Sequence, residues 1–191
     1  MQLTILEAQK ILSHHLGLDV IIEQAYTSSP KIKSDYLKRL DITANLPACD
    51  GEIIQNADVT FNYIDSDFKN WKLNQKQKAQ AQAVEVFEMT NDATSQEMFE
   101  SFDFDLDKLC LTQSQIIEIC RNHKNLLRTD GYETFFLFRK DEKLPAKPDN
   151  LFAAYVRVND DGLYVRVNPF ARGGVWHAEY RPRVVLPQLT L

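Results

Sequence analysis

The sequence lacks the features that disulfide-rich, secreted and membrane proteins share. Its cysteines, Cys49, Cys110 and Cys120, are an odd and sparse set, which favours a reducing compartment over a disulfide framework. No segment reaches the roughly 18 apolar residues that a membrane-spanning helix needs. The first residues contain no basic stretch of the kind that opens a signal peptide. These absences predict a cytoplasmic protein with no membrane partner.

Short catalytic motifs are absent as well. The chain contains no P-loop, no G-x-G-x-x-G, no G-x-S-x-G and no H-E-x-x-H. Their absence removes the enzyme classes that are easiest to recognise without excluding the others. It also gives no reason to expect a cofactor.

The chain is acidic, but its charge is divided unevenly. The formal net charge is −5; residues 1–120 hold 10 Lys/Arg against 19 Asp/Glu, whereas residues 121–191 hold 12 against 8. Nucleic-acid binding depends on attraction to phosphates, so the overall acidity argues against a general nucleic-acid binder. The basic C-terminal third is compatible with a local anionic partner.

An acidic stretch, Asp103-Phe-Asp-Phe-Asp107, resembles the start of an EF-hand calcium loop. Such a loop needs glycine at its sixth position and a bidentate glutamate at its twelfth. Those positions hold Lys108 and Ser114, which excludes an EF-hand. The acidic residues are better explained as solvated groups that favour the positive end of the following helix dipole.

A zinc site is the second metal hypothesis, and its ligand set is also incomplete. Cys120 and His123 lie one turn apart on a predicted helix, and Cys110 and Cys49 could join them. Structural zinc sites normally have two close ligand pairs, and only one is present. No cysteine-hydrolase signature surrounds Cys120 either. We therefore expect no metal, with Cys120 in the core.

Residues 1–50 are predicted to form a helical N-terminal extension. Thr4-Ile-Leu-Glu7 matches a capping box, and apolar residues follow it at helical spacing. A second short helix is expected over residues 34–42. Leu46-Pro-Ala-Cys-Asp-Gly51 then marks a boundary or a long loop. Residues 51–191 would be the main domain.

The last third of the chain is predicted to be an antiparallel sheet. Asn159-Asp-Asp-Gly162 is a strong hairpin signal between two apolar runs. We expect a meander of four or five strands, preceded by helices that begin at capping boxes after Thr94 and Thr112. The predicted class is α+β, with strands over residues 132–139, 151–158, 163–167, 175–181 and 183–186.

Three segments of this region resemble a group of short, uncharacterised bacterial proteins with no assigned activity. They are Asp107-Lys-Leu-Cys-Leu-Thr-Gln-Ser-Gln-Ile-Ile-Glu, Leu127-Arg-Thr-Asp-Gly-Tyr-Glu-Thr-Phe-Phe-Leu-Phe and Val175-Trp-His-Ala-Glu-Tyr-Arg-Pro-Arg-Val-Val-Leu-Pro-Gln. The resemblance covers about residues 68–191. It implies a recurrent unit there but no catalytic or binding residue.

Alternation along the predicted strands separates two sets of side chains. The valines of the hairpin share one side, and polar residues share the other. If the strand over 175–181 is a neighbour, its own polar residues join them. The candidate binding residues are Tyr155, Arg157, Tyr164, Arg166 and Arg181; His177 and Glu179 are the candidate acid/base pair.

This polar face has four interpretations. It can be the solvated side of a half-buried sheet, which alternation alone would produce. It can be a contact surface for a protein or an anionic partner, which is the function we favour and would make the protein non-enzymatic. It can instead hold acid/base chemistry at His177 and Glu179, or bind single-stranded nucleic acid.

Overall fold

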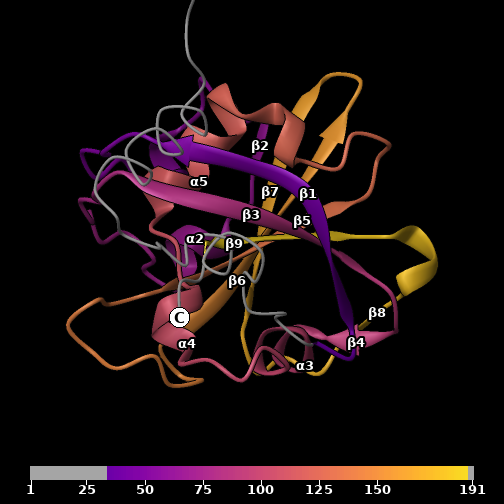
Figure 1. Ribbon diagram of the computed structural model, residues 1–191. Coiled ribbons are helices and arrows are strands. Elements are labelled where there is room, and N and C mark those ends of the chain that lie inside the picture. Colours follow the sequence, from indigo (N-terminus) through magenta and orange to yellow (C-terminus); the bar gives the residue numbers. More distant parts are fainter. Residues whose placement is uncertain (1–33, 189–191) are drawn as a thin grey trace, which may run out of the picture. The chain divides into compact units, whose positions relative to one another are not determined.

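A seven-stranded mixed sheet forms the framework of the protein (Figure 1). The computed structural model describes residues 34–188. Neighbouring strands are antiparallel, except that β9 is parallel to β5 and β2 is parallel to β7. The order across the sheet is β1 (Leu37–Leu46), β3 (Gln82–Met89), β9 (Arg183–Pro187), β5 (Glu133–Arg139), β6 (Leu151–Asn159), β7 (Gly162–Pro169) and β2 (Tyr63–Ile64).

The remaining elements are short. Strands β4 (Ala93–Thr94) and β8 (Val175–Trp176) pair in a separate two-stranded sheet. The helices are α2 (Asp67–Asn70), α3 (Ser95–Glu100), α4 (Leu106–Leu109) and α5 (Gln113–Asn122), with 3-10 turns η1 (Ile54–Asn56), η2 (Lys124–Leu126) and η3 (Ala178–Tyr180). No helix within residues 34–188 is long and apolar enough to cross a membrane.

The predicted fold class is wrong in its central feature. The meander consists only of β5, β6 and β7, because β9 returns to lie parallel to β5 and separates it from β3. Strands from the first half of the chain complete the sheet at both edges. Long-range pairing of this kind leaves no local signal, whereas the hairpin between β6 and β7 does.

The helix expected over residues 34–42 is also wrong. This segment enters strand β1, in which Leu37 pairs with Met89 and Leu46 pairs with Gln82. Pairing along the edge of the sheet overrides the weak helical spacing of three apolar residues. Residues 1–33, which contain most of the expected helical extension, lie outside the described residues.

The strand expected over residues 175–181 is present only at Val175 and Trp176. Two residues further on, the Ala178 amide donates to the side chain of Asp92 at 2.8 Å instead of to a neighbouring strand. The chain then forms the turn η3, and Arg181 adopts a left-handed conformation with φ of 48° before β9 begins. Alternation with period two therefore ends at Trp176.

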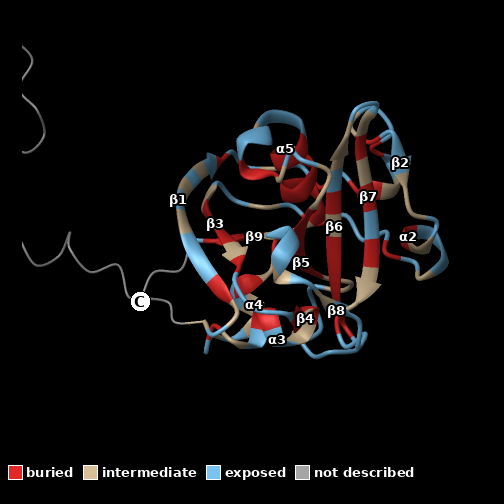
Figure 2. Cartoon of the chain, turned by 90° about the vertical axis from the view of Figure 1, so that its right-hand side faces the viewer, coloured by how far each residue is buried: buried red, intermediate tan, exposed pale blue. Residues whose placement is uncertain are grey.

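Both faces of the sheet are covered near its centre, but by different layers. Helix α5 packs on one face through Ile116 and Ile119, and α3 packs on the other through Met98 and Phe99. The two layers lie on opposite sides of the sheet in Figure 1. Strand β5, which lies between them, is almost entirely buried, as its run of aromatic residues requires (Figure 2).

Helices α3 and α5 begin at the predicted capping boxes. The Thr94 hydroxyl accepts from the Glu97 amide, and the Thr112 hydroxyl accepts from the Gln115 amide. The polar first turn of α5 also binds the chain that crosses it: Gln113 donates its side-chain amide to Leu73 O at 3.1 Å and accepts from the Ile54 amide at 3.0 Å. These contacts hold the segment before β3 against the helix.

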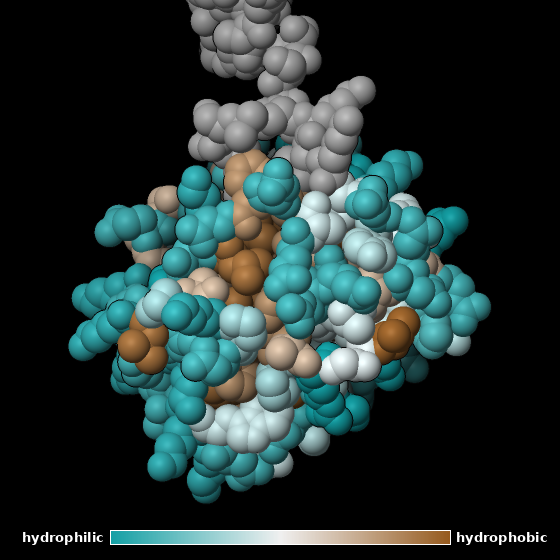
Figure 3. Space-filling model, turned by 90° about the horizontal axis from the view of Figure 1, so that it is seen from below, coloured by the Kyte–Doolittle hydropathy of each residue, from teal (hydrophilic) through white to brown (hydrophobic). Residues whose placement is uncertain are grey.

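The layer of α3 and α4 is incomplete at its edge. Apolar residues at its edge, such as Phe104 and Leu106, are only partly buried. Seen from below Figure 1, the side on which these helices lie is largely hydrophilic, with an apolar band in its middle (Figure 3). This layer does not extend over the whole sheet, since Arg157 of β6 and Arg166 of β7 are exposed.

Candidate binding surface on strands β6, β7 and β2

The paired strands β6 and β7 bring four of the predicted binding residues together. Tyr155 lies opposite Arg166, and Arg157 lies opposite Tyr164. Both arginines are exposed and both tyrosines are partly exposed. Their neighbours Val156, Val165 and Val167 point to the other face and are buried, as alternation predicts; Figure 2 shows the alternation along β7.

Tyr63 of β2 extends this group, and the sequence analysis missed it. It pairs with Tyr164 across the strands, and the two rings stack with centroids 5.6 Å apart. The Arg166 guanidinium lies 5.7 Å from the Tyr63 ring centroid, within range of a cation–π interaction. We call Tyr63, Tyr155, Arg157, Tyr164 and Arg166 the Arg/Tyr surface. Nothing in the sequence around Tyr63 indicates that this segment pairs with β7.

Gly162 allows β2 to lie this close to the hairpin. It has φ of +132°, a conformation that side chains disfavour, and an added Cβ would overlap the Asn62 amide group. Asn62 also donates its backbone amide to Leu163 O at 2.8 Å. The glycine of the predicted turn therefore both closes the hairpin and places Tyr63 against Tyr164.

The two arginines differ in their partners. Arg157 forms an ion pair with Glu133 of β5, whose side chain is only 9% exposed. Arg166 forms no ion pair with a carboxylate of residues 34–188. Arg166 hydrogen-bonds to Tyr155, but its positive charge can bind an external anion without breaking an internal ion pair.

The tyrosines are held by their surroundings. Tyr155 packs between Phe135 and Trp176, with ring centroids 5.8 and 5.2 Å away, and burial raises the pKa of its hydroxyl. Tyr164 donates its hydroxyl to Asp161, and this hydrogen bond raises its pKa. Both side chains are thus neutral and preoriented near neutral pH.

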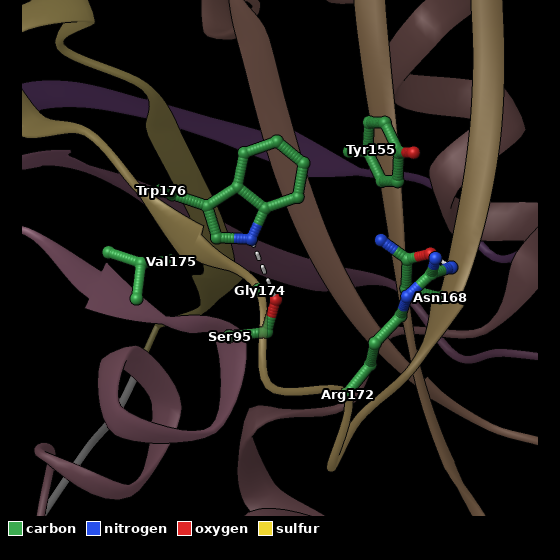
Figure 4. A pocket seen from close by; sticks show the side chains of 7 residues that line it. All are labelled: Ser95, Tyr155, Asn168, Arg172, Gly174, Val175 and Trp176. Carbon is green, nitrogen blue, oxygen red and sulfur yellow. Dashed lines mark hydrogen bonds between the residues drawn. The ribbon is translucent and has the colours of Figure 1, made fainter.

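A cavity of about 220 Å³ adjoins the Arg/Tyr surface at Tyr155. Figure 4 shows the side chains around it. The Trp176 indole donates to Ser95 Oγ at 3.2 Å, and the Arg172 guanidinium donates to Asn168 Oδ1 at 2.7 Å. The lining residues are Ser95, Tyr155, Asn168, Arg172, Gly174, Val175 and Trp176. The cavity combines two aromatic rings with one arginine and is smaller than the roughly 300 Å³ of a typical ligand pocket.

The other predicted residues lie elsewhere. His177 donates through Nδ1 to the Asp92 carboxylate at 2.9 Å, and Glu179 hydrogen-bonds to Tyr180, which raises the pKa of the Tyr180 hydroxyl. Strand pairing does not bring Arg181 to the hairpin, because it precedes β9 and β5 lies between β9 and β6. The residues expected to share one face are therefore divided between two parts of the molecule.

The His177–Asp92 pair was not predicted, although it has the geometry of a general base oriented by a carboxylate. Both side chains are more than half exposed, at 57% and 54%. The Ala178 amide and His177 lower the pKa of the Asp92 carboxyl. Neither His177 nor Glu179 lines the cavity at Tyr155. The pair anchors the turn after β8.

The residues considered as metal ligands have structural positions. Asp105 caps α4, and Asp107 forms an ion pair with Arg139 at 2.8 Å. Burial raises the pKa of the Cys120 thiol, and it raises that of Cys110 to about 12. Within residues 34–188, no three His, Cys, Asp or Glu side chains gather in a way that could hold a metal ion.

Comparisons with known proteins add no relative. No family model matches the chain, and neither a curated protein nor a solved structure does so significantly. The resemblance of residues 68–191 to short bacterial proteins therefore stays a prediction.

Proposed function

We propose that this is a non-enzymatic interaction protein, which binds an acidic segment of a protein partner through the Arg/Tyr surface. The observation that supports the proposal most is the position of Arg166. Its guanidinium lies beside three tyrosines on an exposed part of the sheet and has no internal carboxylate partner among residues 34–188. Arginine and tyrosine are enriched where protein interfaces are strongest.

A peptide fits this surface better than a nucleic acid. Tyr63 and Tyr164 already stack on each other, so fewer ring faces are available to bases. Two carboxylates also lie on this surface, since Glu133 pairs with Arg157 and Asp161 accepts from Tyr164. The carboxylates would repel a nucleic acid, which carries a phosphate at every nucleotide, whereas a peptide can place a single carboxylate at Arg166.

Catalysis has weaker support. The candidate pair of the sequence analysis is not a pair in the structure, because His177 binds Asp92 and Glu179 binds Tyr180. We keep the cytoplasm as the proposed compartment, since all three cysteines are free thiols.

Fluorescence anisotropy with a labelled peptide of alternating glutamate and tyrosine tests the proposal. We expect Arg166→Ala to weaken binding roughly tenfold, the loss of one strong interface contact, and to change the free energy of unfolding by less than about 1 kcal/mol. Lys38→Ala removes the same charge from an exposed position on β1 and should leave the affinity unchanged.

Two results would contradict this function. One is an equal loss of affinity in Arg166→Ala and Lys38→Ala, which would show general attraction to positive charge. The other is tighter binding of a labelled oligothymidine with an affinity that falls steeply as salt rises, which would favour the nucleic-acid interpretation.

A further inference from the structure

A second hollow, separate from the Arg/Tyr surface, lies between the end of α2 and the start of β6. Its volume is about 400 Å³, and Asn70, Trp71, Lys72, Lys140, Phe152 and Pro169 line it. The Trp71 ring packs against Phe152 with centroids 5.8 Å apart and is only partly buried. Helix α2 lies beside β7 (Figure 2). A hollow of this volume can hold a small ligand.

Lys72 lies at the edge of this hollow in a backbone conformation that usually requires glycine. It directly follows Trp71, the C-cap residue of α2, and its φ is +56°. The Leu73 amide donates to Phe68 O at 2.9 Å and the Lys72 amide donates to Lys69 O at 3.0 Å, which is the pattern of a Schellman motif. Glycine is preferred at this position because any side chain there is strained.

The charges around the hollow favour an anion. Residues 67–78 carry four lysines and one aspartate, and residues 139–150 carry four cations and three carboxylates, so the two segments together have a net charge of +4 in a chain of −5. Asp141 hydrogen-bonds to Gln75, which brings the segments together. Neither Lys72 nor Lys140 forms an ion pair within residues 34–188.

We propose that this hollow binds a small phosphorylated ligand with a flat ring. The ring would lie against the Trp71 indole, and the ammonium groups of Lys72 and Lys140 would bind the phosphate. A strained residue that persists outside the core points to a role in binding, because glycine in its place would relieve the strain. The unpaired lysines supply the charge, and Trp71, Phe152 and Pro169 supply an apolar wall.

Calorimetric titration of the full chain with adenosine monophosphate tests this proposal, with adenosine and inorganic phosphate as partial ligands. We expect the monophosphate to bind more tightly than either part. Lys72→Gly should weaken its binding by at least about tenfold, since one charge-assisted contact is lost. The same variant should melt at the same temperature or slightly higher, because glycine removes the left-handed strain.

Three further variants separate the proposal from simpler explanations. Lys140→Ala should weaken binding as Lys72→Gly does, and it decides the outcome if Lys72→Gly proves unstable. Trp71→Leu should reduce the affinity for the monophosphate towards that for phosphate alone. Lys143→Ala removes an equal charge from the same segment but not from the lining of the hollow, so it should have no effect.

The proposal is overturned if millimolar adenosine monophosphate gives no binding signal. It is also overturned if Lys143→Ala weakens binding as much as Lys140→Ala, since this would show unspecific attraction to a basic region. Unchanged affinity in both Lys72→Gly and Lys140→Ala would exclude the hollow as the site.

Discussion

The two faces of the sheet at β6 and β7 differ in burial, although the same two strands form both. On one face, Val156, Val165 and Val167 are buried in the cluster that includes residues of α5. On the other face, Tyr155 packs against Trp176 beside the cluster that includes residues of α3 and α4, whereas Arg157 and Arg166 are exposed. Alternation puts different side chains on the two faces, but the covering elements determine which face can bind a partner.

This difference separates stability from function within single strands. Val165 and Arg166 are neighbours in β7, yet the first is fully buried and the second is exposed. Changes on the covered face should mainly reduce stability, and changes on the Arg/Tyr surface should mainly affect binding.

Phe136→Ala should have the largest effect. The ring is fully buried on the face that α5 covers, and its loss should leave a cavity that costs about 3–5 kcal/mol. Urea denaturation measures this change in the free energy of unfolding. Tyr164→Ala, on the open face, is the matched control and should cost less than about 1.5 kcal/mol. Similar losses in the two variants would show that the open face is as important to stability as the covered one.

Arg157→Ala should have an intermediate effect, because the open face is not uniform. The substitution leaves the nearly buried Glu133 carboxylate without its guanidinium partner, which should cost about 1–2 kcal/mol. The double variant Glu133→Gln, Arg157→Ala should recover most of this loss, since the uncompensated charge is gone. Chemical denaturation of the four proteins in the cycle gives the coupling. If the two substitutions show no coupling, Arg157 does not stabilise the fold through Glu133 and resembles Arg166, which contributes only to binding.

The hairpin and the two capping boxes could be predicted from the sequence because their signals are local. Asn159 and Gly162 close the turn, and Thr94 and Thr112 bind amides only three residues away. The four residues of the Arg/Tyr surface on β6 and β7 follow directly from that hairpin. The burial of the valines on the other face follows from the same alternation.

Elements that depend on distant pairing could not be predicted in this way. β1 is a strand because it pairs with β3, and no residue within it specifies that neighbour. The strand over residues 183–186 was predicted, but nothing in it indicated that β9 lies between β3 and β5. Tyr63 joins the surface through a parallel pair of two residues. His177 does not pair with Glu179, because it binds the Asp92 carboxylate, 85 residues earlier in the chain. The same carboxylate accepts from the Ala178 amide, where strand β8 has ended.

Acidification should have the smallest effect, restricted to the turn after β8. Hydrogen bonds from the Ala178 amide and from His177 lower the pKa of Asp92 below its ordinary value of 3.8. The Asp92 carboxyl therefore binds a proton more readily in the unfolded chain than in the folded one. Its hydrogen bonds stabilise the turn fully above pH 3.8, and this stabilisation is lost as the pH falls through the lower pKa that Asp92 has in the folded protein. In a proton–nitrogen NMR titration, the signals of the Ala178 amide and the Trp176 indole should shift with a midpoint below pH 3.8, while signals of β6 and β7 stay unchanged.

Asp92→Asn keeps an acceptor for the Ala178 amide but has no carboxyl to titrate, so these shifts should disappear. If they persist in that variant, or if the strand signals move with them, a different carboxyl determines the acid response, and the turn is not the independent part of the molecule that its exposed contacts indicate.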